Sequence, residues 1–275
     1  MQKVYRLNVP KKARNYLALT KVVSIDKMSR DLRISKISAK NYLSRAEKLG
    51  LGVKAAQKIL VQAKREMPEM TLEKKKTVSA IREGMPFMDL AIWSLQDLNK
   101  YAHNMVMKNI IFIEAQKDYA KPIQEVLWGK GFNASVLGHS PNIGYLLEIL
   151  REPVLIIPRN DKSGTIKDSA DAHLFISTFE KIIVDIYFLT TRRGLKYPLP
   201  ELGTAMSNLF RFGYSLNFSL LNQVAMRRHV AEEIKSALYF LKNTHPSFFI
   251  PEKYALNRQP DEKRKGFIGE IREGF

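Results

Sequence analysis

The chain has 275 residues, 45% of them hydrophobic, and its 45 Lys and Arg outnumber its 27 Asp and Glu, giving a net charge of +18 and an isoelectric point near 9.9. The hydrophobic content excludes a disordered chain, and the length suffices for one large or two ordinary domains. The absence of Cys excludes disulfides, thiol nucleophiles and Cys-ligated metals.

The ends and the hydropathy point to a soluble protein. Met1–Pro10 lacks the apolar stretch of a secretory signal, and no run approaches the ~18 apolar residues of a membrane span. We therefore expect a cytoplasmic protein.

The N-terminal residues carry most of the excess charge. Residues 1–65 contain 17 Lys and Arg against three acids, a net charge of +14. Residues 66–83 carry four charges of each sign, and residues 84–275 carry 24 basic and 20 acidic side chains, a net charge of +4. This distribution is typical of a nucleic-acid-binding module attached to a near-neutral domain. The alternative is a basic surface that serves only solubility.

Three helices are predicted within this basic segment. The first starts at Lys11, and the second is short and has Ser24 as its N-cap. After a turn at Arg33–Ile34, Ser35 caps a longer third helix that ends at Gly50. A short helix, a tight turn and a longer helix form the helix-turn-helix arrangement.

The third helix has two contrasting sides. Its apolar side is predicted to pack on the other two helices and consists of Ala39, Tyr42, Leu43, Ala46 and Leu49. Its outward side contains no acid, because Glu47, the helix's only carboxylate, lies to one side. Lys and Arg can reach phosphates or guanine, and Asn can pair with adenine. The residues predicted to contact DNA are Lys36, Ile37, Ser38, Lys40, Asn41, Ser44, Arg45 and Lys48.

The segment after Gly50 has two interpretations. Residues 51–54 and 58–62 can form the two strands of a wing, although the intervening turn lacks Gly and Asn; residues 55–63 can equally form a fourth helix. RNA binding, or a winged helix that contacts only proteins, remains an alternative to DNA binding.

A charged linker is predicted at residues 66–85, between Pro68 and Pro86, with Thr71 capping a polar helix that runs to about Arg82. The Lys74–Lys76 run within it indicates a solvated face or additional phosphate contacts.

Residues 86–250 are predicted to form a larger domain. Over residues 86–158, short apolar strands alternate with helices, which favours an α/β sheet covered by helices. Ser94 with Asp97, and Ser177 with Glu180, have the spacing of helix caps. After residue 158 the chain is predicted to be helical, and residues 251–275 to be a loosely ordered basic tail.

The fold class expected is therefore mixed α+β and α/β. It comprises a winged helix-turn-helix in residues 1–65, the linker, and an α/β domain with a small mixed sheet and a helical C-terminal part.

Several segments carry a family resemblance. The order of an N-terminal winged helix, DLAIWSLQDLN (Asp89–Asn99), VLIIP, TFEKIIVDIYF (Thr178–Phe188) and NFSLLNQVAMRRH (Asn217–His229) resembles the AbiEi-type antitoxins of type IV toxin–antitoxin (abortive infection) systems. The resemblance implies a repressor that binds its own promoter, a larger domain needed for antitoxin action, and a nucleotidyltransferase-type toxin as partner. The chain departs from this family in its wing, which lacks a Gly/Arg-rich tip.

The enzymatic signals are weak, and we expect no catalytic residues, no metal and no cofactor. The five His residues lack the spacing of a helical metal site, and no phosphate-binding glycine motif occurs. Asp168, Asp171 and His173 lie close together but favour a polar loop. Glu114 misses the Glu-x-Lys spacing of nucleases by one position, and Asp185 suits a hydrogen-bonded structural carboxylate.

Two functions of different classes remain open. The first is a DNA-binding transcriptional regulator of antitoxin type, and the second is a nuclease or nucleotidyltransferase that captures nucleic acid through the basic module. Asp89, Glu114, Asp168 and Asp171 are the acids that such an enzyme would use. A scaffold protein that assembles through its helices is a third possibility, and the oligomeric state is open.

Overall fold

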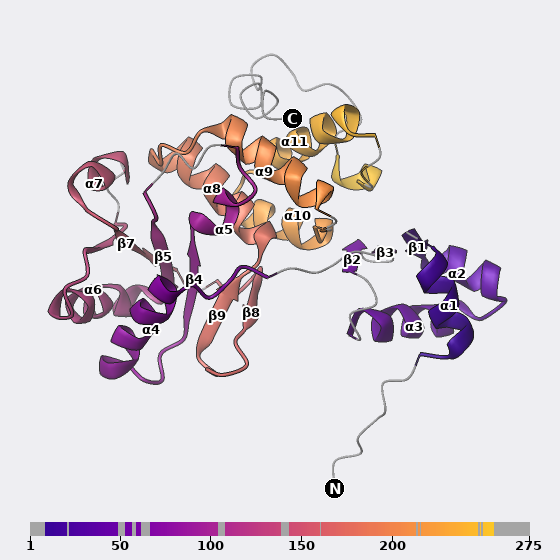
Figure 1. The fold of residues 1–275 in the computed structure, drawn as a ribbon, viewed down its shortest axis with the longest axis horizontal. Coiled ribbons are helices and arrows are strands. Elements are labelled where there is room, and N and C mark those ends of the chain that lie inside the picture. Colours follow the sequence, from indigo (N-terminus) through magenta and orange to yellow (C-terminus); the bar gives the residue numbers. More distant parts are fainter. Residues whose placement is uncertain are drawn as a thin grey trace, which may run out of the picture. The chain divides into compact units, whose positions relative to one another are not determined.

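A computed structural model describes residues 9–20, 22–48, 53–56, 59–61, 67–103, 108–138, 143–159, 161–212, 214, 216–246, 248 and 250–255. The chain divides into two compact units, one made of residues 1–66 with 209–219, the other of residues 67–208 with 220–275. Figure 1 shows their elements in chain order.

The first unit contains helices and a small antiparallel sheet. Its elements are α1 (Lys11–Leu19), β1 (Val22–Ser24), α2 (Ile25–Leu32), α3 (Lys36–Lys48), β2 (Val53–Ala56) and β3 (Ile59–Val61). The strand order is β1-β3-β2. The three helices expected from the sequence are confirmed, whereas β1 was not expected.

The segment of residues 51–62 contains strands where it is described. β2 and β3 pair antiparallel, with an irregularity in register between Lys54 and Ala56. The fourth-helix alternative is therefore wrong for residues 55–56 and 59–61. Gly50 and the interstrand residues Gln57 and Lys58 lie outside the described residues.

A compact apolar cluster holds the three helices of the first unit together. Met28 of α2 and Ala39 and Ala46 of α3 are fully buried in it. The small alanine side chains let the helices approach closely. The Tyr16 hydroxyl of α1 donates a 2.6 Å hydrogen bond to Asp31 Oδ2 of α2. Burial and this carboxylate raise the pKa of Tyr16 to about 12.

The second unit is built on a six-stranded mixed sheet of order β6-β7-β5-β4-β9-β8. β5, β6 and β7 are mutually parallel, β4 and β9 run parallel to each other and opposite to them, and β8 closes a hairpin with β9. The strands are β4 (Leu90–Ser94), β5 (Ile111–Ala115), β6 (Ala134–Val136), β7 (Val154–Pro158), β8 (Thr165–Lys167) and β9 (Leu174–Ser177).

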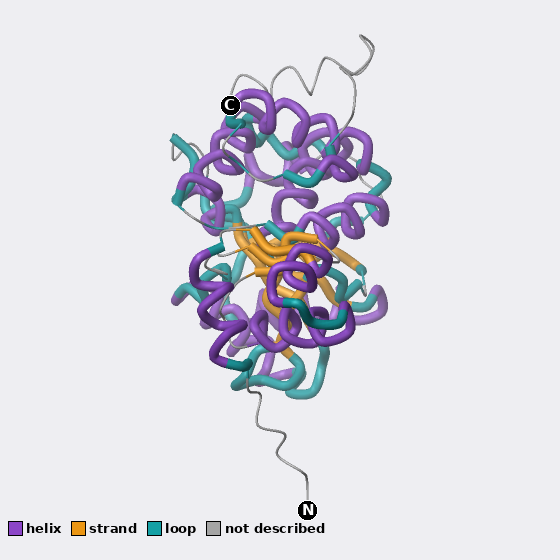
Figure 2. The backbone as a smooth tube through the Cα atoms, turned by 90° about the vertical axis from the view of Figure 1, so that its right-hand side faces the viewer, coloured by secondary structure: helices purple, strands orange, loops and turns teal. Residues whose placement is uncertain are grey.

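Helices cover both faces of this sheet, as Figure 2 shows edge-on. The accompanying elements are α4 (Leu72–Gly84), α5 (Gln96–Asn99), η1 (Lys117–Tyr119), α6 (Ala120–Gly129), α7 (Ile143–Ile149), α8 (Phe179–Arg193), α9 (Leu199–Arg211), α10 (Phe218–Arg227), α11 (Ala231–Thr244) and η2 (Glu252–Tyr254). α4 and α6 pack on one face, and α8 lies over the other. Because both faces are covered, the central strands are buried throughout and read as continuous apolar runs.

Alternate strand residues point to opposite layers. Ile92 and Ile113 belong to the cluster under α4 and α6. Trp93 and Phe112 face the other layer, where their rings stack at 4.0 Å. Glu114 follows on the Phe112 side, which places a buried carboxylate in the layer under α8.

Residues 72–84, assigned to a linker by the sequence, form α4 and contribute Val78 and Ile81 to the core of the second unit. Thr71 caps this helix as expected, accepting from Lys74 N. Lys74 does not lie on a solvated face: its side chain is fully buried, and Nζ lies 2.6 Å from Asp97 Oδ1. Lys75 and Lys76 are exposed.

The structure corrects three local expectations in the larger domain. The chain is not purely helical after residue 158, because β8 and β9 complete the sheet. Ser94 ends β4, and its hydroxyl makes no hydrogen bond within the described part of the chain, so it does not cap the helix that follows. The other half of the expected Ser-x-x-Asp cap is present, because Asp97 Oδ2 accepts from Ser94 N–H at 2.7 Å. The cap expected from Ser177 is absent: Thr178 is the N-cap of α8, and neither hydroxyl makes a hydrogen bond in the described part of the chain.

Of the expected tail, residues 251–255 contain η2 and the buried Tyr254. The rest, residues 256–275, lies outside the described residues. No helix among the described residues is both long and apolar enough to span a bilayer.

Candidate nucleic-acid interface

Apart from Lys48, whose side chain the structure does not describe, the side chains selected for DNA contact lie on the outward side of α3. Ile37 is the most apolar of them and is 74% exposed. Ser38 is half-buried. The remaining members are all exposed, namely Lys36, Lys40, Asn41, Ser44 and Arg45.

The opposite side of α3 is apolar and buried. Ala39, Leu43 and Ala46 are buried in the core of the first unit, and Tyr42 packs against it. This confirms the two-sided assignment of the helix, except for Leu49, which lies outside the described residues. Burial of the apolar side fixes which residues α3 presents outward.

A tight turn sets the direction of α3. Arg33 adopts a left-handed conformation with φ 53°, and Ile34 N donates to Ser29 O at 3.0 Å. The Ser29 hydroxyl donates back to Ile34 O at 2.6 Å, which closes the turn from both sides. Ser35 Oγ then accepts from Ser38 N–H at 3.0 Å, so the predicted cap of α3 is confirmed.

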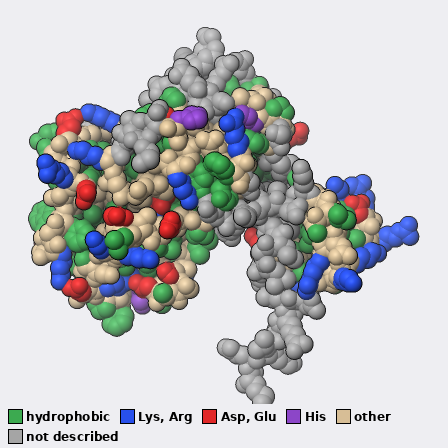
Figure 3. Space-filling view, viewed as in Figure 1, with side chains coloured by type: hydrophobic (Ala, Val, Ile, Leu, Met, Phe, Trp, Pro, Cys, Tyr) green, Lys and Arg blue, Asp and Glu red, His purple; other side chains and the backbone are tan. Residues whose placement is uncertain are grey.

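The outward side of α3 is electropositive. Lys36 Nζ lies 2.8 Å from Asp26 Oδ1, but both side chains are more than half exposed, so this pair is weak in water. Lys40 and Asn41 make no ion pair or side-chain hydrogen bond within the described part of the chain. Figure 3 shows basic side chains spread over the surface of this unit.

The acids considered for catalysis lie in the second unit, where β5 ends and β4 and β9 begin. Glu114 of β5 and Asp185 of α8 belong to one buried network. Lys181 Nζ lies 2.5 Å from both Glu114 Oε1 and Asp185 Oδ2. Arg228 Nε donates to Asp185 Oδ1 at 2.6 Å. Two carboxylates thus face two cations, so the charge is balanced.

The pKa values of the two buried carboxyl groups are shifted in opposite directions. Burial raises the pKa of Glu114, and the neighbouring Asp185 adds to the increase despite the attraction of Lys181. Burial also favours a higher pKa for Asp185, but Lys181 and Arg228 outweigh it and lower the pKa. Asp185 therefore holds its negative charge more firmly, and its role as a hydrogen-bonded carboxylate is confirmed.

Lys181 and Arg228 are members of this network that the sequence did not reveal. One signal was available: Lys181 and Asp185 stand four residues apart in the apolar segment EKIIVDIYF, where charges need partners. The pairing with Glu114, 67 residues away, has no local signature.

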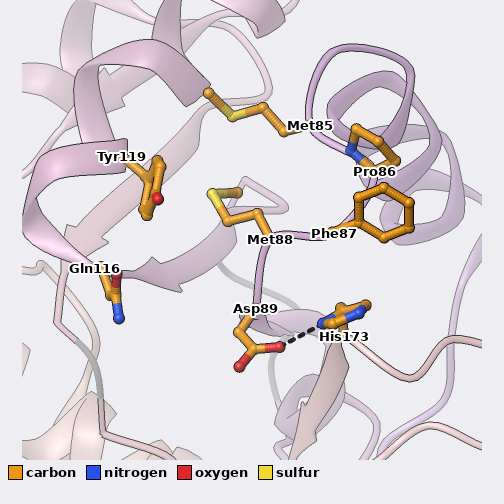
Figure 4. A pocket seen from close by; sticks show the side chains of 8 residues that line it. All are labelled: Met85, Pro86, Phe87, Met88, Asp89, Gln116, Tyr119 and His173. Atoms are coloured by element: carbon orange, nitrogen blue, oxygen red, sulfur yellow. Dashed lines mark hydrogen bonds and ion pairs between the residues drawn. The ribbon is translucent and has the colours of Figure 1, made fainter.

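A recess of about 450 Å³ lies beside the start of β4. Figure 4 shows Tyr119 and Phe87 on opposite sides of it, with Met88 between them and Asp89 near His173. His173 Nδ1 is 2.8 Å from Asp89 Oδ1, and Lys162 pairs with the other oxygen. Lys162 and then His173 lower the pKa of Asp89, so its charge is already compensated.

Asp168 and Asp171 lie in the β8–β9 connection, which confirms the polar loop. Asp168 Oδ1 accepts from Ala170 N at 3.0 Å. Asp171 accepts from His173 N at 2.8 Å and from Arg82 Nε at 2.6 Å. Both carboxylates thus hold the loop. Among the described residues, no group of three or more His, Asp or Glu is placed to hold a metal ion.

Comparison with known proteins places the chain in a family. Residues 31–244 match DUF6577, which is described as a family of unknown function. No curated protein matches the chain. The matched residues run from α2 to the end of α11 and include both α3 and the six-stranded sheet. They cover well over half of the 275 residues, and the chain therefore belongs to the DUF6577 family.

Proposed function

We propose that residues 1–65 are a winged helix-turn-helix that binds double-stranded DNA through α3, and that the protein is a DNA-binding transcriptional regulator. The observation that carries the proposal is the exposed side of α3, which combines Lys40, Asn41 and Arg45 without a carboxylate. A helix of this kind fits the major groove, where basic side chains meet phosphates and Asn reads adenine.

The arrangement around α3 supports the proposal. α2, the turn at Arg33 and α3 follow one another as in a helix-turn-helix, and the β2–β3 pair follows α3 where a wing would stand. The net charge of +14 over residues 1–65 supplies attraction to a polyanion. The exposed Ile37 offers an apolar contact for a thymine methyl group.

A salt titration tests DNA binding by the full chain. Each phosphate neutralised by Lys or Arg contributes about −0.9 to the slope of log affinity against log salt. If Lys36, Lys40 and Arg45 each meet a phosphate, the slope is about −3 or steeper. A slope near zero would refute binding through this face.

Two substitutions distinguish contacts to the DNA bases from electrostatic attraction to the phosphates. Lys40→Ala is expected to weaken binding to all DNA sequences alike and to reduce the slope of log affinity against log salt by about 0.9. Asn41→Ala is expected to cost about 1–3 kcal/mol on the preferred sequence and to relax the choice of base at one position. Lys121→Ala, which removes an exposed lysine of α6 in the second unit, is the matched control and should leave DNA affinity unchanged. An equal loss on every sequence with Asn41→Ala would contradict the base-reading role.

The resemblance to AbiEi-type antitoxins supports a more specific proposal, namely repression of the protein's own promoter and partnership with a nucleotidyltransferase-type toxin. A reporter gene placed behind the chain's own upstream DNA tests the first part. The wild-type chain should repress it, and Lys40→Ala should relieve the repression. Protection of growth against a co-expressed toxin from the neighbouring gene tests the second part. Growth arrest that the chain does not relieve would refute it.

A further inference from the structure

The second unit contains a cavity of about 180 Å³ whose lining is apolar apart from arginines. Its walls come from the ends of β6 and β7, where Leu137 and Ile157 lie, and from Phe188 and Leu189 of α8. The position is outside the carboxyl ends of parallel strands, which is where open α/β sheets bind their ligands.

Three guanidinium groups line this cavity, from Arg159, Arg193 and Arg228. Arg228 is 9% exposed and is fixed by Asp185 and by the Phe188 ring, whose centroid lies 4.9 Å from its Cζ. Arg159 follows β7 and pairs with Asp161. Two of the three cations are therefore held in place before any ligand arrives, which lowers the entropy lost on binding.

Arg193, in the last turn of α8, differs from the other two arginines. Within the described part of the chain its side chain makes no ion pair or hydrogen bond, whereas that of its neighbour Arg192 pairs with Glu233. The half-buried guanidinium of Arg193 therefore has hydrogen-bond donors left for an anion that enters the cavity.

The ionic groups around the cavity carry an excess of positive charge. Three carboxylates, from Glu114, Asp161 and Asp185, are linked by ion pairs to Lys181, Arg159, Arg227 and Arg228. Together with Arg193 this makes five cations against three anions, a net charge of +2. An incoming anion is attracted by this excess without displacing an existing pair.

We propose that this cavity binds a small organic anion, a phosphate monoester or carboxylate head group attached to a compact apolar body. The guanidinium of Arg193 receives the head group, and Phe188 and Ile157 surround the body. The volume corresponds to about six water molecules at ~30 Å³ each, which suits a head group with one small ring and excludes a whole nucleotide. The proposal does not depend on DNA binding by residues 1–65.

Calorimetric titration of the full chain tests the proposal with four probes. Phenyl phosphate and benzoate carry both parts of the ligand with different head groups, inorganic phosphate lacks the apolar body, and benzyl alcohol lacks the charge. We expect one-to-one binding of phenyl phosphate or benzoate, at least tenfold tighter than that of inorganic phosphate or benzyl alcohol. Binding of neither aromatic anion, or equal binding of inorganic phosphate, would overturn the proposal.

Two adjacent substitutions assign the binding to this cavity. Arg193→Gln removes the unpaired guanidinium and is expected to weaken the aromatic anion at least tenfold, because a charge-assisted hydrogen bond is lost. Arg192→Gln removes the same charge one residue away and is expected to change affinity less than twofold, as is Lys40→Ala on α3. A loss with Lys40→Ala, or equal effects of Arg193→Gln and Arg192→Gln, would locate the anion elsewhere. Arg193→Gln should keep the DNA affinity of the wild-type chain, and this measurement distinguishes loss of anion binding from loss of the proposed DNA binding.

Discussion

Replacing Lys181 by Met removes the cation that two buried carboxylates share. The side chains of Lys181, Glu114 and Asp185 are 1%, 1% and 0% exposed, so water cannot compensate for the loss. Met retains the length and the apolar stem of Lys, so the packing changes little. Removing one partner of a buried pair costs about 3–5 kcal/mol because the remaining charge is uncompensated.

The expected loss is measurable by thermal unfolding of the full chain, followed by circular dichroism at pH 7. For a unit of roughly 150–250 residues, each 1 kcal/mol lowers the midpoint by about 2–4 °C, so Lys181→Met should lower it by roughly 6–20 °C. The matched control is Lys196→Met, whose pair with Glu148 is exposed on both sides and should cost less than about 1 kcal/mol.

Two further measurements separate charge from packing. The pKa of Glu114 is raised even beside Lys181, so without Lys181 the carboxyl should protonate more readily and lowering the pH should recover part of the stability. Adding Glu114→Gln to Lys181→Met should likewise recover part of it. A loss no larger than that of the control, or no recovery in either experiment, would refute the charge argument.

Three other predictions follow from the described contacts. Gly164→Ala should lower the free energy of unfolding, measured by urea denaturation, by about 2–5 kcal/mol, because φ is +73° and the added Cβ would lie 2.8 Å from Lys181 Cβ. Gly131→Ala, with φ +79° and open space around it, should cost only the strain of the left-handed backbone, about 1–2 kcal/mol, and equal losses would contradict the steric reasoning. Ser35→Ala should destabilise the first unit by about 1 kcal/mol through loss of the cap on Ser38 N–H, seen as faster amide exchange at the start of α3, while Ser44→Ala should leave exchange there unchanged. Burial alone would raise the pKa of Asp171, but the His173 N–H and Arg82 lower it, so the Asp171 carboxylate stabilises the fold above its unfolded pKa of about 3.9. Asp171→Asn should therefore lower the free energy of unfolding at pH 7, and the difference from wild type should vanish as the pH falls through the lower pKa of the folded state. A difference that persists to pH 2 would contradict the assignment.

The sequence predicted elements well where the signal is local. Ser24, Ser35 and Thr71 cap their helices as expected, because an N-cap depends on side chains within three residues of one another. The exposed and buried sides of α3 followed from helical periodicity alone.

The failures share a physical cause, which is dependence on distant partners. β1 and β9 are three and four residues long, too short to show the alternating pattern of a strand by themselves, and pairing with β3 and β4 determines them. Lys74 was read as solvated because the residues around it are charged, although Asp97, 23 residues away, binds it in the interior. The recess beside Asp89 likewise brings together segments around residues 87, 119 and 173.

The strand order of the second unit has a consequence for its folding during synthesis. β4 pairs with β5 on one side, but its other neighbour, β9, begins about 80 residues later at Leu174. At roughly 5–20 residues per second, the outer backbone of β4 stays unpaired on the ribosome for about 4–16 s. An apolar strand with an open edge invites pairing with other chains. Translation speed between residues 94 and 177 should therefore affect how much of this protein reaches its folded state.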